Sequence, residues 1–155
     1  MNTEEKYMLK SIEIAKSGFK AGEYPIGAVI VKNDKIIAVG EVRRKRDEDP
    51  TAHAEIVAIR NACNKLNSRS LEGCIIYSTQ ECCPMCTSAI IWAKMDGIIF
   101  GAFSSDTKGK ETNNYSWRQI DISCKELLSK SLPKIELIEG FLREKCKELL
   151  DFDSN

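Results

Sequence analysis

One histidine, one glutamate and two cysteines are spaced as a metal site with an adjacent acid requires. His53 and Glu55 are separated by one residue, and Cys83 and Cys86 follow later in the chain with two residues between them. Zinc prefers imidazole and thiolate ligands in a tetrahedron, and a catalytic zinc site uses three protein ligands and leaves the fourth position to water. His53 is the only histidine, so any metal site with a histidine ligand must use it. The spacing therefore predicts zinc on His53, Cys83 and Cys86.

Glu55 extends this prediction to a hydrolytic reaction. A carboxylate beside the metal can take a proton from water, because zinc lowers the pKa of bound water towards neutrality. The hydroxide could then attack a ring carbon that bears an amino group. Glu55 could hand the proton to a ring nitrogen and then to the departing ammonia. These residue types therefore suit hydrolytic deamination.

Both halves of the motif are predicted to lie at the start of a helix. Residues 49–51 (Asp-Pro-Thr) supply a capping residue and a proline, and the apolar residues that follow at helical spacing predict a helix over 52–66. Pro84 is expected in the first turn of a second helix over 84–94, since proline loses no hydrogen bond there. The partial positive charge of two converging N-termini would favour thiolates at the two cysteines.

Two other interpretations of the cysteine pair stay open. A closed structural zinc site would need a fourth ligand, for which Cys82 is the candidate. If the cysteines instead form a redox-active dithiol, His53 and Glu55 have no assigned role. The combination of the two motifs, in this order, is more specific than either motif alone.

Three stretches of sequence extend the motif. Residues 24–29 read Tyr-Pro-Ile-Gly-Ala-Val, residues 49–55 read Asp-Pro-Thr-Ala-His-Ala-Glu, and residues 81–86 read Glu-Cys-Cys-Pro-Met-Cys. With them the chain resembles the cytidine deaminase-like superfamily, and more narrowly its bacterial guanine deaminase and tRNA adenosine deaminase branch. The resemblance covers nearly the whole chain.

This resemblance implies a fold, a mechanism and an assembly. The fold is a three-layer α-β-α sandwich with a mixed five-stranded sheet, and the assembly is a homodimer. Zinc is held by the three ligands already named, with Glu55 as the proton shuttle. By position, the resemblance also implies that Ile26 packs against the base and that the backbone of Ala54 hydrogen-bonds it.

The chain departs from the family pattern in three places. Cys82 replaces the family proline before the first cysteine ligand. The family usually carries an asparagine that hydrogen-bonds the base in the stretch that corresponds to residues 41–48. This chain has no asparagine there, and Arg43 and Arg44 are the nearest candidates to replace it. Guanine deaminases tend to carry acidic residues where this chain has asparagines at 113–114. Because arginine offers donors only, we expect the best substrate to carry an acceptor facing this hairpin.

Helical and strand patterns alternate along the chain, which predicts an α/β protein with a mixed sheet covered on both faces. We expect one domain over 1–155. The first predicted helix starts near Thr3. The other predicted helices cover 52–66, 84–94, 124–130 and 142–150. The predicted strands cover 26–32, 35–40, 74–78, 98–100 and 134–138, and the first two are joined by a turn at Asn33 and Asp34.

The polar stretch 102–119 is a candidate wall of the pocket, because long loops in compact domains are more often functional than idle. Trp117 lies in or beside this loop, where it could stack on a base. Trp92 lies on the predicted helix over 84–94 and is expected to make a core or dimer contact.

Composition limits the environment and the partners. The 155 residues include 23 basic and 23 acidic side chains, and this balance favours a small molecule over a nucleic acid, whose binders usually carry a basic surplus. Seven cysteines without a framework spacing fit a reducing cytoplasm. No apolar run approaches about 20 residues, and residues 1–10 lack the apolar stretch of a signal peptide, so we expect no membrane partner.

The leading interpretation is a zinc-dependent hydrolase that acts on the C–N bond of a cyclic amidine. It would release ammonia from an amino-substituted nucleobase or nucleoside, in the manner of a guanine deaminase with altered base recognition. A tRNA wobble adenosine deaminase is the first alternative, because residues 134–140 and the helix after them resemble the C-terminal segment of that family. Cytosine deaminase is a second alternative, and a structural zinc or binding module is the non-enzymatic one.

Overall fold

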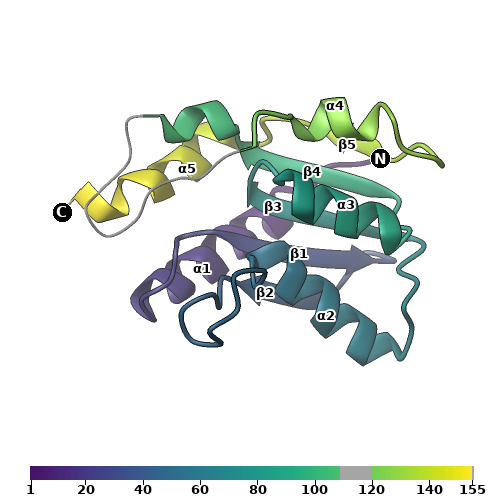
Figure 1. Cartoon of the computed structure of the whole chain (residues 1–155), viewed down its shortest axis with the longest axis horizontal. Coiled ribbons are helices and arrows are strands. Elements are labelled where there is room, and N and C mark those ends of the chain that lie inside the picture. Colours follow the sequence, from purple (N-terminus) through teal and green to yellow (C-terminus); the bar gives the residue numbers. More distant parts are fainter. Residues whose placement is uncertain (109–119, 155) are drawn as a thin grey trace.

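The computed structural model describes residues 1–108 and 120–154, in which a mixed five-stranded sheet lies between two layers of helices (Figure 1). The strand order is β2-β1-β3-β4-β5; β1 runs antiparallel to β2 and β3, and β3, β4 and β5 run parallel. The strands are β1 (Gly27–Lys32), β2 (Lys35–Glu41), β3 (Cys74–Gln80), β4 (Gly97–Ala102) and β5 (Glu136–Ile138). The predicted α/β sandwich is confirmed.

The helices divide between the two faces of the sheet. One core lies under α2, α3 and α4, and a second core lies under α1, α5 and the 3-10 helix η2 (Figure 1). The bounds are α1 (Glu5–Lys20), α2 (Ala54–Leu66), α3 (Pro84–Trp92), η1 (Ser104–Thr107), α4 (Cys124–Leu128), α5 (Arg143–Lys147) and η2 (Glu148–Ser154). Strands β3 and β4 have nearly all their residues buried because helices cover both of their faces.

The hairpin between β1 and β2 turns where the sequence predicts it. Asn33 and Asp34 both have positive φ, 49° and 57°. A two-residue turn with two positive φ values matches the twist of an antiparallel pair, and asparagine and aspartate tolerate that conformation. This hairpin directs β2 towards the helix that carries His53.

Two glycines allow helices to lie directly on the sheet. A Cβ atom at Gly40 would collide with the backbone of Ala54 and Ala58 in α2. A Cβ atom at Gly27 would collide in the same way with the backbone of α1. The close approach at Gly40 fixes the first turn of α2, and with it the motif, against the edge of the sheet.

Some predicted boundaries differ from the structure. The helix predicted over 52–66 begins at Ala54, and His53 is its N-cap residue, so Asp49 does not cap it. Asp49 instead accepts hydrogen bonds from the backbone and hydroxyl of Thr51, at 2.8 and 2.7 Å, because an aspartate can close such a local turn. The helix predicted over 142–150 is split into α5 and η2.

Two further features concern the cysteines and the helix lengths. All seven cysteines are free thiols. Within residues 1–108 and 120–154, no helix has the length and hydrophobicity needed to span a bilayer.

Candidate zinc and substrate site

The three predicted ligands meet where two helices begin. His53 is the N-cap residue of α2 and Cys83 is the N-cap residue of α3. Pro84 occupies the first turn of α3 as predicted, and Cys86 lies in the same turn. The ligand atoms of His53, Cys83 and Cys86 all lie within 4.8 Å of one another.

The spacing of these atoms fits a zinc ion. The Nδ1 atom of His53 lies 3.7 Å from Sγ of Cys83 and 3.5 Å from Sγ of Cys86. Zinc bonds of about 2.3 Å to sulfur and about 2.0 Å to nitrogen, at a tetrahedral angle, place the ligand atoms about 3.5 Å apart. The imidazole and the two thiols are therefore arranged as zinc ligands without a rearrangement of the backbone.

Cys82 lies outside this ligand group. Its side chain is 1% exposed and belongs to the core under α2 and α3. Burial, the largest cause, raises the pKa of the Cys82 thiol, so this cysteine stays protonated. In the part of the chain that the structure describes, the ligand group contains three side chains, as an open catalytic site requires.

The site favours a thiolate at Cys83. A hydrogen bond from Cys86 and a second contact with His53 lower the pKa of Cys83 to about 4, against the opposing effect of burial. The same contact with Cys83, together with burial, raises the pKa of Cys86. Without a metal only one of the paired thiols ionises readily, and a divalent cation would supply the positive charge that stabilises the second thiolate.

Glu55 is held beside the ligand group. The side chain is 3% exposed, and its Oε1 atom accepts a 2.9 Å hydrogen bond from the hydroxyl of Ser78 in β3. Its Oε2 atom lies 3.4 Å from Sγ of Cys86. Burial, the largest cause, raises the pKa of the Glu55 carboxyl. A raised pKa makes the carboxylate a stronger base, which suits a group that must accept and return a proton.

A pocket of about 340 Å³ opens over this group. His53, Glu55 and Cys83 line it, and Ile26 lies in its wall. Ala54 is fully buried next to His53 and is not among the lining residues. The remaining lining residues supply apolar walls and a few polar groups: Pro50, Gln80, Glu81, Pro84, Met85, Ser104, Ile120 and Ile122.

Glu81 joins two segments of the pocket wall. Its carboxylate accepts hydrogen bonds from the backbone of Ser104, at 2.8 Å, and of Cys124, at 3.1 Å. Glu81 is only 9% exposed, so both bonds are shielded from water. Glu81 therefore fixes η1 and the start of α4 around one side of the pocket.

Sequence reasoning missed Ser78, Gln80 and Glu81. The signal that could have found them is the polar end of an apolar strand, because β3 begins with buried aliphatic residues and ends at Gln80. Gln80 is 7% exposed and donates a 3.1 Å hydrogen bond to the carbonyl of Phe103. Polar side chains buried at the carboxyl end of a central strand often belong to a binding site.

Other predicted positions lie elsewhere. Asn113, Asn114 and Trp117 lie outside the described residues. Arg43 and Arg44 are not among the residues that line the pocket, so neither occupies the place of a base-reading side chain there. The guanidinium of Arg43 is engaged by Asp47, with contacts of 2.9 and 3.0 Å.

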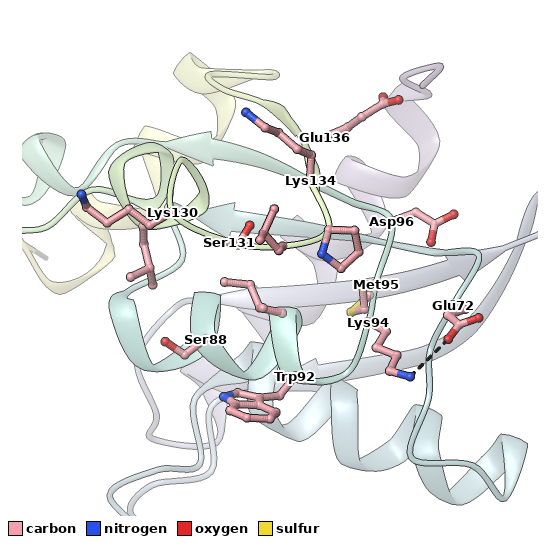
Figure 2. A pocket seen from close by; sticks show the side chains of 14 residues that line it. Glu72, Ser88, Trp92, Lys94, Met95, Asp96, Lys130, Ser131, Lys134 and Glu136 are labelled. Carbon is pink, nitrogen blue, oxygen red and sulfur yellow. Dashed lines mark ion pairs between the residues drawn. The ribbon is translucent and has the colours of Figure 1, made fainter.

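Trp92 is not a core residue. It is 84% exposed and lines a separate hollow of about 950 Å³ between the end of α3 and the segment before β5. Figure 2 shows Trp92 projecting from α3 and marks the ion pair between Lys94 and Glu72, which also line the hollow. Leu132, which is 85% exposed, lines the same hollow.

Comparison with known proteins supports this reading of the geometry. Residues 1–102 match the family model for the cytidine and deoxycytidylate deaminase zinc-binding region. The tRNA-specific adenosine deaminase of Bacillus subtilis is 36% identical over 150 residues, which are 97% of this chain and 88% of the relative. The guanine deaminase of the same species is 38% identical over 124 residues, 79% of this chain and 80% of the relative.

Solved structures agree with the sequence relatives. A structure from a study of A-to-I editing by tRNA:A34 deaminases at the wobble position of transfer RNA has a TM-score of 0.81 to this chain. It is 30% identical in sequence, and the match covers 94% of this chain and 99% of the other.

Proposed function

The chain belongs to the cytidine and deoxycytidylate deaminase family, and we propose that it hydrolytically deaminates an adenosine of transfer RNA at a zinc site. Family membership makes the protein a deaminase, a hydrolase of C–N bonds, so a purely structural zinc module is set aside. What we propose is the identity of the substrate, an adenosine of transfer RNA.

One observation carries this choice. Similarity to the tRNA-specific adenosine deaminase of Bacillus subtilis extends over 97% of the chain, whereas similarity to the guanine deaminase extends over 79%. The solved structure linked to tRNA editing matches 94% of the chain at 30% identity, whereas a guanine deaminase structure from Nitrosomonas europaea that matches 97% of the chain is 24% identical. The sequence by itself favoured a nucleobase or nucleoside over transfer RNA, and the extent of similarity to curated relatives supports the reverse order.

The ligand residues and Glu55 would divide the chemistry between them. His53, Cys83 and Cys86 would hold zinc, which supplies Lewis acidity when bound. Glu55 would take a proton from the attacking water and deliver it to a ring nitrogen of the base, and then assist the departure of ammonia. The hydrogen bond from Ser78 would orient the carboxylate for both transfers.

The pocket walls would position the base. Ile26, which lines the pocket, would pack against one face of the ring. The pocket volume, about 340 Å³, is at the lower end for small-ligand sites, so it suits a single base rather than a larger group. The rest of a polynucleotide would then lie outside the pocket.

Guanine is the second candidate substrate. The guanine deaminase of Bacillus subtilis is slightly more identical over the shorter region it matches, 38% against 36%. The equal numbers of acidic and basic residues also remove a general attraction to nucleic acid. Both observations favour a small substrate.

A direct comparison of substrates tests the proposal. Zinc-loaded protein is incubated with an anticodon stem-loop RNA that carries adenosine at the wobble position, and inosine is measured after digestion. Ammonia release from guanine, adenine, cytosine and their nucleosides is measured in parallel. We expect inosine in the RNA and little ammonia from free bases. Rapid turnover of guanine without inosine in the RNA would reject transfer RNA in favour of the second candidate.

A further inference from the structure

Four basic residues follow β2, and the structure divides them into two kinds. Arg43 is paired with Asp47, and Arg46 is paired with Glu41 at 3.0 Å and with Glu23 at 3.7 Å. Arg44 and Lys45 make no ion pair with any residue that the structure describes. Neither positive charge is therefore neutralised by a direct ion pair within the described residues.

Arg44 also has an unused hydrogen-bond donor. Its Nε atom is the one buried side-chain nitrogen or oxygen without a hydrogen-bond partner in residues 1–108 and 120–154. Buried donors are nearly always paired, so an unpaired one calls for a specific explanation such as an absent acceptor. The Nε atom and a terminal nitrogen of arginine together form a fork that binds the two oxygens of an anion.

Both cations lie over one aromatic ring. The guanidinium carbon of Arg44 is 5.3 Å from the centre of the Tyr24 ring, and the Nζ atom of Lys45 is 5.6 Å from it. Contact with the face of the ring attracts a cation without neutralising it. The positive charges of Arg44 and Lys45 therefore lie close together over the ring of Tyr24.

A buried carboxylate restrains the turn that carries Arg44 and Lys45. Glu23, which is 3% exposed, accepts backbone hydrogen bonds from Lys45 at 3.0 Å and Arg46 at 2.8 Å. A buried carboxylate that binds two backbone N–H groups restrains the conformation of the turn. The positions of Arg44 and Lys45 thus do not depend on a substrate.

The same turn is tied to the segment that enters the zinc site. The backbone of Arg43 donates to Ala52 at 3.0 Å, and the backbone of Asp49 donates to Arg44 at 3.1 Å. Ala52 immediately precedes His53.

We propose that Arg44 and Lys45, supported by Tyr24, form a binding site for a phosphate group of the substrate, beside the base pocket rather than inside it. This rests on the proposed function, in which the substrate is a polynucleotide. Arg44 binds two phosphate oxygens through its fork, and Lys45 adds a second positive charge. The neighbouring Arg43 takes no part because Asp47 already occupies its fork.

Binding of RNA at several salt concentrations tests the site. Glu55→Gln serves as the background, so that the labelled anticodon stem-loop RNA is not consumed, and affinity is measured by fluorescence anisotropy. We expect Arg44→Ala to weaken binding about tenfold and to reduce the slope of log affinity against log salt by about one, as for one lost phosphate contact. Lys45→Ala reduces the slope in the same direction.

Two further variants serve as controls. Arg43→Ala lies in the same turn but removes an arginine that is paired with Asp47, so RNA binding should match the parent. Arg44→Lys keeps the charge without the fork and should recover part of the affinity. Zinc content and circular dichroism confirm that each variant is folded.

A second probe separates the two sources of phosphate. Binding of adenosine and adenosine 5′-monophosphate is compared in the parent and in Arg44→Ala. A loss confined to the RNA assigns the site to a phosphate of the polynucleotide, and a loss for the mononucleotide, with adenosine unchanged, assigns it to the nucleotide's own phosphate. Both results support a phosphate site.

Other results overturn the proposal. They are an unchanged salt slope in both Arg44→Ala and Lys45→Ala, an equal loss in Arg43→Ala, or failure of the parent to bind either phosphate-containing probe. Failure of the proposed function is read separately, as absence of inosine from RNA treated with the active enzyme.

Discussion

The hydroxyl of Ser78 donates a 2.9 Å hydrogen bond to Oε1 of Glu55, and both side chains are buried, one in β3 and the other in α2. The bond leaves Oε2 facing the ligand group, 3.4 Å from Sγ of Cys86. A buried carboxylate with one oxygen held by a hydroxyl has a defined orientation. The carboxylate of Glu55 is thus oriented by a strand that contributes none of the three ligand residues.

Glu55→Gln should retain zinc and the fold but lose turnover. The amide matches the carboxylate in shape and cannot carry the proton, so we expect a fall in kcat of about two to four orders of magnitude. Ser78→Ala leaves the carboxylate in place and removes only its orientation, so the fall should be nearer tenfold, about 1.4 kcal/mol. Steady-state kinetics and zinc analysis measure both variants. A Glu55→Gln enzyme with a near-normal rate would falsify the proton-shuttle role.

Cys83→Ala and Cys82→Ala form a matched pair that distinguishes an open zinc site from a closed one. Cys83→Ala removes one of three ligands and should lose zinc and activity together. Cys82→Ala should keep one zinc per chain, because Cys82 lies in the core outside the ligand group. It should cost only about 1 kcal/mol of stability from the small cavity. Loss of zinc from Cys82→Ala would instead favour a closed structural site.

Glu81→Gln should impair substrate binding more than chemistry. The amide oxygen can keep one of the two backbone hydrogen bonds, to Ser104 or to Cys124, but its NH₂ group cannot accept the other. We expect KM to rise about tenfold, with kcat changed less than threefold, because one lost buried hydrogen bond to a charged group is worth about 1.5 kcal/mol. Zinc content is the control. Equal losses in kcat and in thermal stability, with KM unchanged, would show a structural role only.

Trp92→Glu should disrupt the homodimer that the family resemblance leads us to expect. Trp92 and Leu132 are among the most exposed large apolar residues that the structure describes, at 84% and 85%, and they line one hollow. Exposed aromatic residues at such a hollow are typical anchors of an interface. Sedimentation velocity should show a dimer for the parent and a monomer for the variant. A parent that sediments as a monomer at all concentrations would exclude the dimer.

The sequence alone was enough to predict the class of fold and a zinc site of His53, Cys83 and Cys86. Glu55 lies beside these ligands, as its spacing from His53 indicated. His53 with Glu55, and Cys83 with Cys86, are spaced so that each pair lies within the first turn of one helix. Such short-range geometry follows from helix periodicity, whatever the rest of the chain does. Hydrophobic periodicity likewise indicated the strands and helices, although the helix that begins at Ala54 starts two residues later than expected because Asp49 closes a turn of its own.

Only the tertiary structure decided which groups complete the site. Ser78 meets Glu55 from 23 positions away, and Glu81 meets Cys124 from 43. No local pattern specifies such pairs, because a buried hydrogen bond depends on which strand and helix pack together. The same holds for the basic run after β2. Arg43 and Arg46 are paired with Asp47, Glu41 and Glu23, whereas Arg44 and Lys45 form no ion pair with a described residue. Tertiary packing determines which side chains form hydrogen bonds and ion pairs with one another, and residue type alone does not predict these pairs.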